Sequence, residues 1–114
     1  MELDLQPNEK RCAFTEHEHT LELSGFCPFS SNPLPGSSIT VKYKGGNHFL
    51  EVVDLHSFIQ SYCGGKGDIR SMEGMLQEIA QTCADSLRVD VTLTSHLLLE
   101  PKQTMRVTCY AFPK

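Results

Sequence analysis

The chain has 114 residues, of which 39% are hydrophobic and 21% charged, and its formal net charge is −4 at pH 7. A chain of this length forms one domain and buries enough surface to fold without disulfides or a metal. Its acidic balance and scattered Lys and Arg residues argue against nucleic acid as the main partner, and no apolar run is long enough to cross a bilayer.

The first residues, MELDLQPNEKR, begin with acidic side chains and contain no apolar run. No secretory signal is therefore expected. The five cysteines are odd in number and show no CxxC spacing. We therefore expect reduced thiols and a cytoplasmic location.

Residues 1–18 are expected to form a polar N-terminal arm, and residues 19–114 a single folded domain. Hydrophobic residues alternate over residues 19–25, which predicts a strand. A proline-rich connection follows over residues 26–38. Alternation of β-branched and aromatic residues over residues 39–44 predicts a second strand, which ends at a glycine-containing turn.

Two helices are expected in the middle of the chain. Asp54 is a suitable N-cap for the first, whose apolar positions share one face and which should end at Gly64–Gly65. The second is longer and fits residues 69–87, with Ser71 or Asp68 as its cap.

The alternating pattern returns over residues 89–98 and 104–112 and predicts two more strands. The order strand, strand, helix, helix, strand, strand predicts an α+β domain. In it, two helices pack on one face of a four-stranded antiparallel sheet. Edge strands of such a sheet need covering, and joining the edges between subunits would close a barrel. A homo-oligomer is therefore expected.

Cys27 follows the first expected strand, at the head of the proline-rich connection. Pro28 favours an extended backbone at the preceding residue, which would orient the thiol reproducibly. Such a thiol is a candidate nucleophile if a cation or a helix N-terminus lowers its pKa. It is also explained as a core residue between Phe26 and Phe29.

Two carboxylates are candidate ligands for a base. Glu73 falls in the first turn of the second expected helix, between Met72 and Met75, where the helix dipole favours a negative charge. A carboxylate beside apolar side chains can accept paired hydrogen bonds from the N–H edge of a guanine or pterin. For Glu73, and for Glu51 near the end of a short apolar stretch, a solvated surface acid is the simpler interpretation.

His17 and His19 are expected on one strand face, because alternate residues of a strand share a side. Such a pair could bind zinc if Cys12 or Cys27 completed the ligand set, although no spacing pattern supports this. We expect no metal, and keep a zinc-dependent pterin-type enzyme as an alternative function.

Three runs, FCPFSSNPLPGSSITVKY, FLEVVDLHSFIQSY and DIRSMEGMLQEI, resemble the unimodular 7-cyano-7-deazaguanine reductases of queuosine biosynthesis, the QueF-type nitrile reductases. The chain is also similar to their archaeal amidinotransferase relatives, and the resemblance covers roughly residues 19–111. It implies a tunnel fold (T-fold) with ββααββ order, assembled from several copies into a barrel. By this resemblance Cys27 attacks the substrate nitrile, Glu73 anchors the base, and Glu51 leads the family's helix motif.

Several positions depart from the family pattern. Leu34 stands where the family has the aspartate that helps to protonate the nitrile nitrogen, and Met72 replaces a histidine. Val53 and His56 replace the two lysines that bind NADPH, and Cys63 replaces an arginine. The resemblance thus implies NADPH as cofactor, whereas the residues that would bind it are missing. Binding of the base depends on Cys27 and Glu73, which the chain keeps.

Two functions from different classes follow. The first is an enzyme that forms a Cys27 thioimide with 7-cyano-7-deazaguanine, followed by reduction or by addition of ammonia or an amine. The second is a non-catalytic module that holds a purine, deazapurine or pterin. In both, the partners are a small planar base and further copies of the chain, with no membrane and no nucleic acid.

Overall fold

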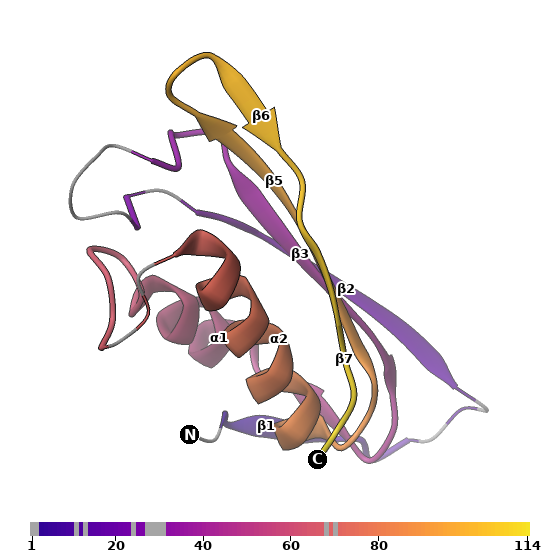
Figure 1. Ribbon diagram of the computed structural model, residues 1–114. Coiled ribbons are helices and arrows are strands. Elements are labelled where there is room, and N and C mark those ends of the chain that lie inside the picture. The colour runs from indigo at the N-terminus through magenta and orange to yellow at the C-terminus, as the bar shows by residue number, and fades with distance from the viewer. Residues whose placement is uncertain are drawn as a thin grey trace.

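A computed structural model of the chain describes residues 3–10, 12, 14–23, 25–26, 32–67, 69 and 71–114. Two helices lie on one side of an antiparallel sheet, so the α+β class expected from the sequence is confirmed (Figure 1). The elements are, in chain order, β1 (Leu5–Pro7), β2 (Thr15–Glu22), β3 (Ser38–Gly45), β4 (His48–Leu50), α1 (Val52–Gln60), α2 (Met72–Leu87), β5 (Val91–Leu99), β6 (Gln103–Met105) and β7 (Thr108–Ala111).

The main sheet follows the order β2-β3-β5, and β6 and β7 both pair with β5. β6 pairs with the C-terminal end of β5 and β7 with its N-terminal end, so the two short strands occupy one position in the sheet. All these pairs are antiparallel. β1 and β4 form a separate two-stranded sheet.

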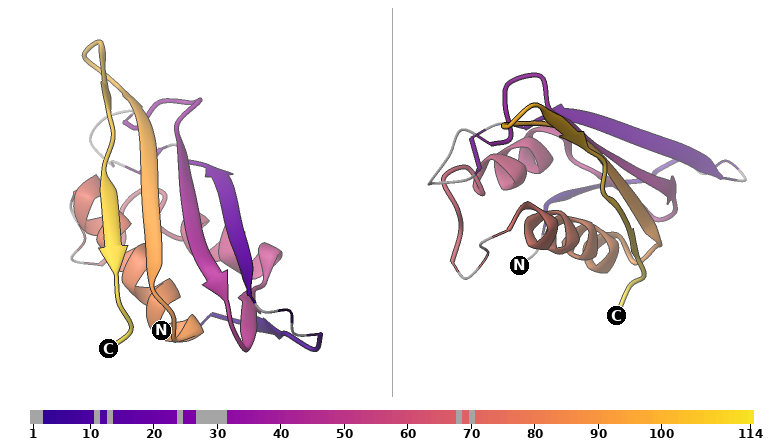
Figure 2. Two further views of the ribbon diagram at one scale, coloured as in Figure 1. Left: turned by 90° about the vertical axis from the view of Figure 1, so that its right-hand side faces the viewer. Right: turned by 45° about the horizontal axis from the view of Figure 1, so that its top comes forward.

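Alternation along the strands places apolar side chains against the helices. Along β5, the odd-numbered residues from Val91 to Leu99 are buried, and the even-numbered residues are not. β3 shows the same alternation, with Ile39, Val41 and Tyr43 buried. The left view of Figure 2 shows this sheet in front of both helices, so neither described helix covers its other face. Four threonines form a cross-strand row on that open face: Thr20, Thr40, Thr94 and Thr108.

Both helices begin at side chains that accept backbone hydrogen bonds. Ser71 caps α2, with its Oγ 3.0 Å from the backbone nitrogen of Gly74, and is one of the two caps expected from the sequence. The other, Asp68, lies outside the described residues. α1 begins at Val52, earlier than expected, and its N-cap is Glu51. The expectation that Asp54 caps this helix is wrong, because Asp54 lies in the first turn.

The N-terminal part carries more regular structure than an arm. Leu5–Pro7 pairs with β4, and Leu3 is buried. β2 begins at Thr15, so the boundary expected between residues 18 and 19 falls inside a strand. The sequence pattern concealed the start of β2, because His17 and His19 occupy positions on the helix-facing side where alternation normally places aliphatic residues.

The last expected strand is interrupted. Arg106 and Val107 separate β6 from β7, and the buried Ser95 of β5 faces this break. Its hydroxyl accepts a hydrogen bond from the Val107 backbone N–H at 3.0 Å and lies 3.2 Å from the Val107 carbonyl oxygen. A side chain therefore supplies hydrogen bonds where the regular strand pairing is broken. Neither helix in the described part of the chain has the length and apolar character needed to cross a membrane.

Candidate functional site

The segments that flank Cys27 are anchored, while Cys27 itself lies outside the described residues. The backbone N–H of Gly25 donates to the carbonyl oxygen of Pro33 at 3.2 Å, which joins the two flanks. The carbonyl oxygen of Gly25 accepts from the backbone N–H of Gly64 at 3.0 Å. Phe26 is buried. The start of the proline-rich connection is thus hydrogen-bonded to the loop between α1 and α2.

The C-terminal flank is fixed to the end of β5. The Asn32 side chain donates to the carbonyl oxygen of Glu100 at 2.9 Å and accepts from its backbone N–H at 2.8 Å. The Leu34 backbone N–H donates to Leu98, and the Ser37 hydroxyl accepts from the Leu98 backbone N–H at 2.9 Å. The half-buried Leu34 therefore has a fixed backbone, and its aliphatic side chain cannot donate a proton.

Glu51 is engaged by the helix that follows it. One carboxylate oxygen accepts from the Val53 backbone N–H at 3.1 Å and the other from the Asp54 backbone N–H at 2.7 Å. These are two of the N–H groups at the helix start that have no partner within the helix. The structure thus gives Glu51 a capping role that the sequence interpretation did not include.

We expect Glu51→Ala to lower the free energy of unfolding by about 0.5–2 kcal/mol, the usual cost of losing an N-cap. Thermal unfolding followed by circular dichroism measures this as a lower melting temperature. Glu73→Ala is the matched control, because Glu73 is an exposed first-turn glutamate without a described partner. Equal losses in the two variants would contradict the capping role.

Of the two candidate carboxylates, Glu51 and Glu73, it is Glu73 that is available to a ligand. It lies in the first turn of α2 with an exposed side chain. Among the described residues, no hydrogen bond or ion pair engages its carboxylate. Glu51 and Glu73 begin different helices, and no described interaction joins them. A ligand could therefore use Glu73 without breaking an internal contact.

A groove of about 660 Å³ lies between β2 and α1. Two histidines, His19 from the strand and His56 from the helix, line it. Val52 and Val53 line it as well, although they are 65% and 68% exposed. The sequence placed His19 on a strand and His56 on a helix, whereas Val52 and Val53 were expected before the helix start. The meeting of these residues depends on how α1 packs beside β2, which no local pattern reveals. The other lining residues are Thr20, Leu21, Glu22 and Gln60.

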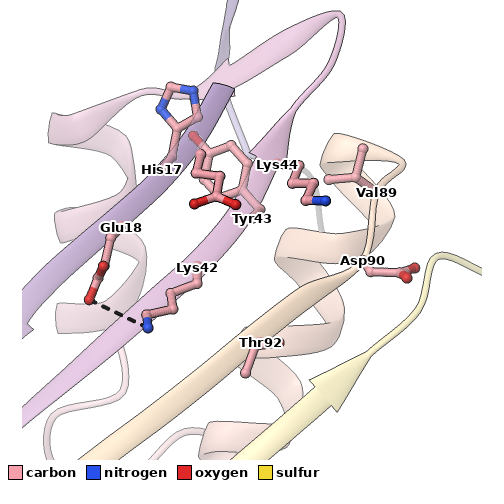
Figure 3. Close-up of a pocket in the computed structure, with 9 residues that line it drawn as sticks. His17, Glu18, Lys42, Tyr43, Lys44, Val89, Asp90 and Thr92 are labelled. Atoms are coloured by element: carbon pink, nitrogen blue, oxygen red, sulfur yellow. Dashed lines mark ion pairs between the residues drawn. The ribbon is translucent and has the colours of Figure 1, made fainter. Parts of the chain in front are cut away.

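A second, open pocket of about 890 Å³ lies at one end of the sheet (Figure 3). Lys42 and Glu18 reach toward one another from neighbouring strands, with 3.8 Å between their charged atoms. Both side chains are more than half exposed, so this ion pair adds little stability. The lining mixes carboxylates with lysines and does not favour a ligand of one charge. It comprises Glu16, His17, Glu18, Lys42, Tyr43, Lys44, Val89, Asp90 and Thr92.

His17 and His19 share a strand face, as the sequence predicts, but both are engaged with Tyr43. The His17 ring stacks on it with centroids 4.9 Å apart, and the His19 ring at 5.8 Å. Within the part of the chain that the structure describes, no three His, Cys, Asp or Glu side chains are grouped to hold a metal ion. The exposed Cys12 belongs to no such group, and Cys27 lies outside that part.

No protein-family model matches this chain, and no curated protein matches it. Any function therefore has to be inferred from its own residues. Those that bear most directly on chemistry are the unengaged carboxylate of Glu73, the anchored flanks of Cys27, and the histidine-lined groove beside β2.

Proposed function

We propose that the chain is a QueF-like T-fold protein that binds a 7-deazaguanine-type base and forms a thioimide with 7-cyano-7-deazaguanine through Cys27. The observation that carries this is Glu73, an exposed carboxylate without a described partner in the first turn of the long helix. The α+β architecture and the resemblance around Cys27 support the same function. A cytoplasmic setting would keep the Cys27 thiol reduced.

Glu73 suits the amino-pyrimidinone edge of such a base. That edge carries two adjacent N–H donors, and an ionised carboxylate offers two acceptor oxygens at matching spacing. Its position at the start of α2 suits a negatively charged group, because the helix dipole favours negative charge there. The base is thereby oriented as well as held.

The covalent step needs a thiolate and a proton. The Cys27 sulfur adds to the nitrile carbon, a C–S bond forms, and one C–N π bond gives its electrons to nitrogen, which takes up a proton. Leu34 cannot supply that proton. Attack of ammonia or an amine on the thioimide carbon would then expel the Cys27 thiolate and leave an amidine, with no change in oxidation state.

The residues do not fit NADPH, the cofactor that the family resemblance implies. At the positions of the cofactor-binding lysines stand Val53, whose side chain is exposed, and His56. Among the described residues, no lysine or arginine lines the groove beside them, so these residues offer no permanent positive charge to the cofactor's phosphates. We therefore derive no reductive step.

The direction of the strands supports assembly into a ring. Neighbours in the main sheet are antiparallel across four positions, so β7 runs opposite to β2. Rotating the molecule about an axis along the strands would bring β7 of one copy beside β2 of the next in antiparallel orientation. Repetition closes a barrel and leaves no free edge. This is the T-fold arrangement that we propose.

Intact-mass spectrometry with 7-cyano-7-deazaguanine tests the covalent step. The wild-type chain should gain the full mass of the ligand, because addition to a nitrile expels nothing. Cys27→Ala should show no adduct. Cys63→Ala, which removes an exposed thiol, serves as the control and should behave as the wild type. An adduct on Cys27→Ala, or none on the wild type, would overturn the role of Cys27.

A non-catalytic binding module is the second candidate. The aliphatic Leu34, fixed on the end of β5, favours it because the position that should donate a proton cannot do so. In this case calorimetry should detect binding of the base to the wild type and Cys27→Ala with similar affinity, without an adduct on either.

A further inference from the structure

β2 has a free outer edge. The strand pairs with β3 over all eight of its residues, from Thr15 opposite Gly45 to Glu22 opposite Ser38. No described strand pairs with its other side. Natural proteins often protect such an edge with a proline, a bulge or charged side chains. β2 contains no proline and pairs with β3 without a bulge, so its backbone can receive another strand, and its charged side chains restrict which strand that is.

Charge indicates which strand this edge fits. Glu16, Glu18 and Glu22 project to the open face of the sheet. Two antiparallel copies of β2 would bring both sets of glutamates onto one face, and like charges across a strand pair are destabilising. β7 carries Thr108 and the 72% exposed Tyr110 on that face, and no acid. β7 of a second copy would therefore meet the edge of β2 without the like-charge repulsion that a second β2 would bring.

The helix-facing side of β2 carries the histidines. His17 lies flat on the Tyr43 ring, at an interplanar angle of 7°, and also contacts Phe49. Its Nε2 is 2.8 Å from the Thr15 hydroxyl. His19 lies over the same tyrosine ring, and its Nε2 is 3.4 Å from the Tyr43 hydroxyl. The packing of β2 on this side therefore depends on two imidazoles.

The surroundings of His19 favour its neutral form. Burial and then the nearby His17 lower the pKa of His19 below its ordinary value of 6.5. The titratable groups that face it are His17 from β2, Tyr43 from β3, and His56 from α1 across the groove. Glu22 lines the end of the groove, but its exposed side chain projects to the opposite face of β2.

We propose that protonation of His19, which lines the groove between β2 and the first turn of α1, releases β7 of a second copy from the outer edge of β2. The proposal rests on the ring assembly proposed above. A strand docked on β2 covers the groove between β2 and α1 and removes water from His19. The docked state therefore disfavours the charged imidazole more strongly than the free chain does.

The direction of the effect follows from linkage. A histidine whose pKa is lowered on docking contributes fully to assembly above the pKa that it has in the free chain. That contribution is lost as the pH falls through the pKa of the free chain, which for His19 lies below 6.5, toward the still lower pKa of the docked state. Each proton taken up on release changes the assembly constant by at most about tenfold per pH unit.

Native mass spectrometry or sedimentation at about pH 7.5 and about pH 5.5 tests this across the imidazole titration range. The wild type should be a ring at the higher pH. Its apparent dissociation constant should rise several-fold at the lower pH, by at most about tenfold for one histidine per contact. In His19→Gln, which keeps a polar side chain but cannot gain charge, the constant should stay within about twofold.

His48→Gln is the matched control, because His48 is exposed on β4, which pairs with β1 and not with a strand of the main sheet, and should respond to pH as the wild type does. An assembly unchanged between the two pH values would overturn the proton control and leave the ring intact. A monomer at both pH values would overturn the docking edge and the ring. The Cys27 adduct, measured separately, would still decide the covalent chemistry.

Discussion

Glu73→Gln is expected to weaken binding of 7-deazaguanine by roughly 10–150-fold and to leave the fold unchanged. A hydrogen bond to a charged group contributes about 1.5–3 kcal/mol, and each 1.4 kcal/mol is a factor of ten. The amide that replaces the carboxylate has one oxygen acceptor, and its NH₂ group would face an N–H donor of the base. 7-Deazaguanine lacks the nitrile, so calorimetry with this ligand measures reversible binding alone.

The loss should be specific to affinity, because Glu73 has an exposed side chain and no described internal partner. Glu9→Gln makes the same chemical change at an exposed position of the N-terminal segment and should bind as the wild type does. Melting temperatures of both variants should stay close to that of the wild type, since surface changes without partners have small effects. Unchanged affinity in Glu73→Gln would remove the carboxylate from the proposed site.

The sequence was sufficient where periodicity and burial agree. α2 repeats its buried residues at helical spacing, from Met75 to Leu87, and its end at Leu87 was predicted correctly. β5 alternates buried and less buried residues, although it begins and ends slightly later than predicted. In both elements the core selects apolar side chains at every inward position, so the pattern is complete along the chain.

Prediction was less successful where the inward positions are polar or the partners are distant. β2 directs His17 and His19 toward the helices, so alternation of hydrophobicity did not reveal its first half. β1 was not predicted, because a three-residue strand has too few positions to show a period and pairs with β4 about forty residues later. The start of α1 depends on the Glu51 carboxylate folding back onto two backbone N–H groups.

The candidate site, too, was predictable from the sequence only in part. The first-turn position of Glu73 follows from the helix pattern, and its exposure agrees with a carboxylate that is available to a ligand. The groove joins residues from β2 and α1, and its two histidines are separated by more than thirty positions in the sequence. Only tertiary packing brings them together, so a single sequence could not reveal that groove.

Tyr43→Phe is expected to cost about 1–3 kcal/mol of stability, although it removes only one oxygen atom. Tyr43 is buried, and its hydroxyl oxygen accepts the backbone N–H of Leu50 at 2.9 Å. That bond ties β4, and through it β1, to the main sheet. The phenylalanine ring fills the same space but leaves the Leu50 N–H without its acceptor in the interior. The His19 ring also loses its contact with the hydroxyl.

Tyr110→Phe separates this effect from the general consequence of losing a hydroxyl. Tyr110 is 72% exposed, and no described residue bonds its hydroxyl, so its variant should unfold like the wild type. For a domain of this size, a melting temperature falls by about 4–8 °C per kcal/mol lost. Only Tyr43→Phe should show such a fall, together with faster amide exchange at Leu50. If both variants melted like the wild type, the Tyr43 hydroxyl would not be needed to hold β4 on the main sheet.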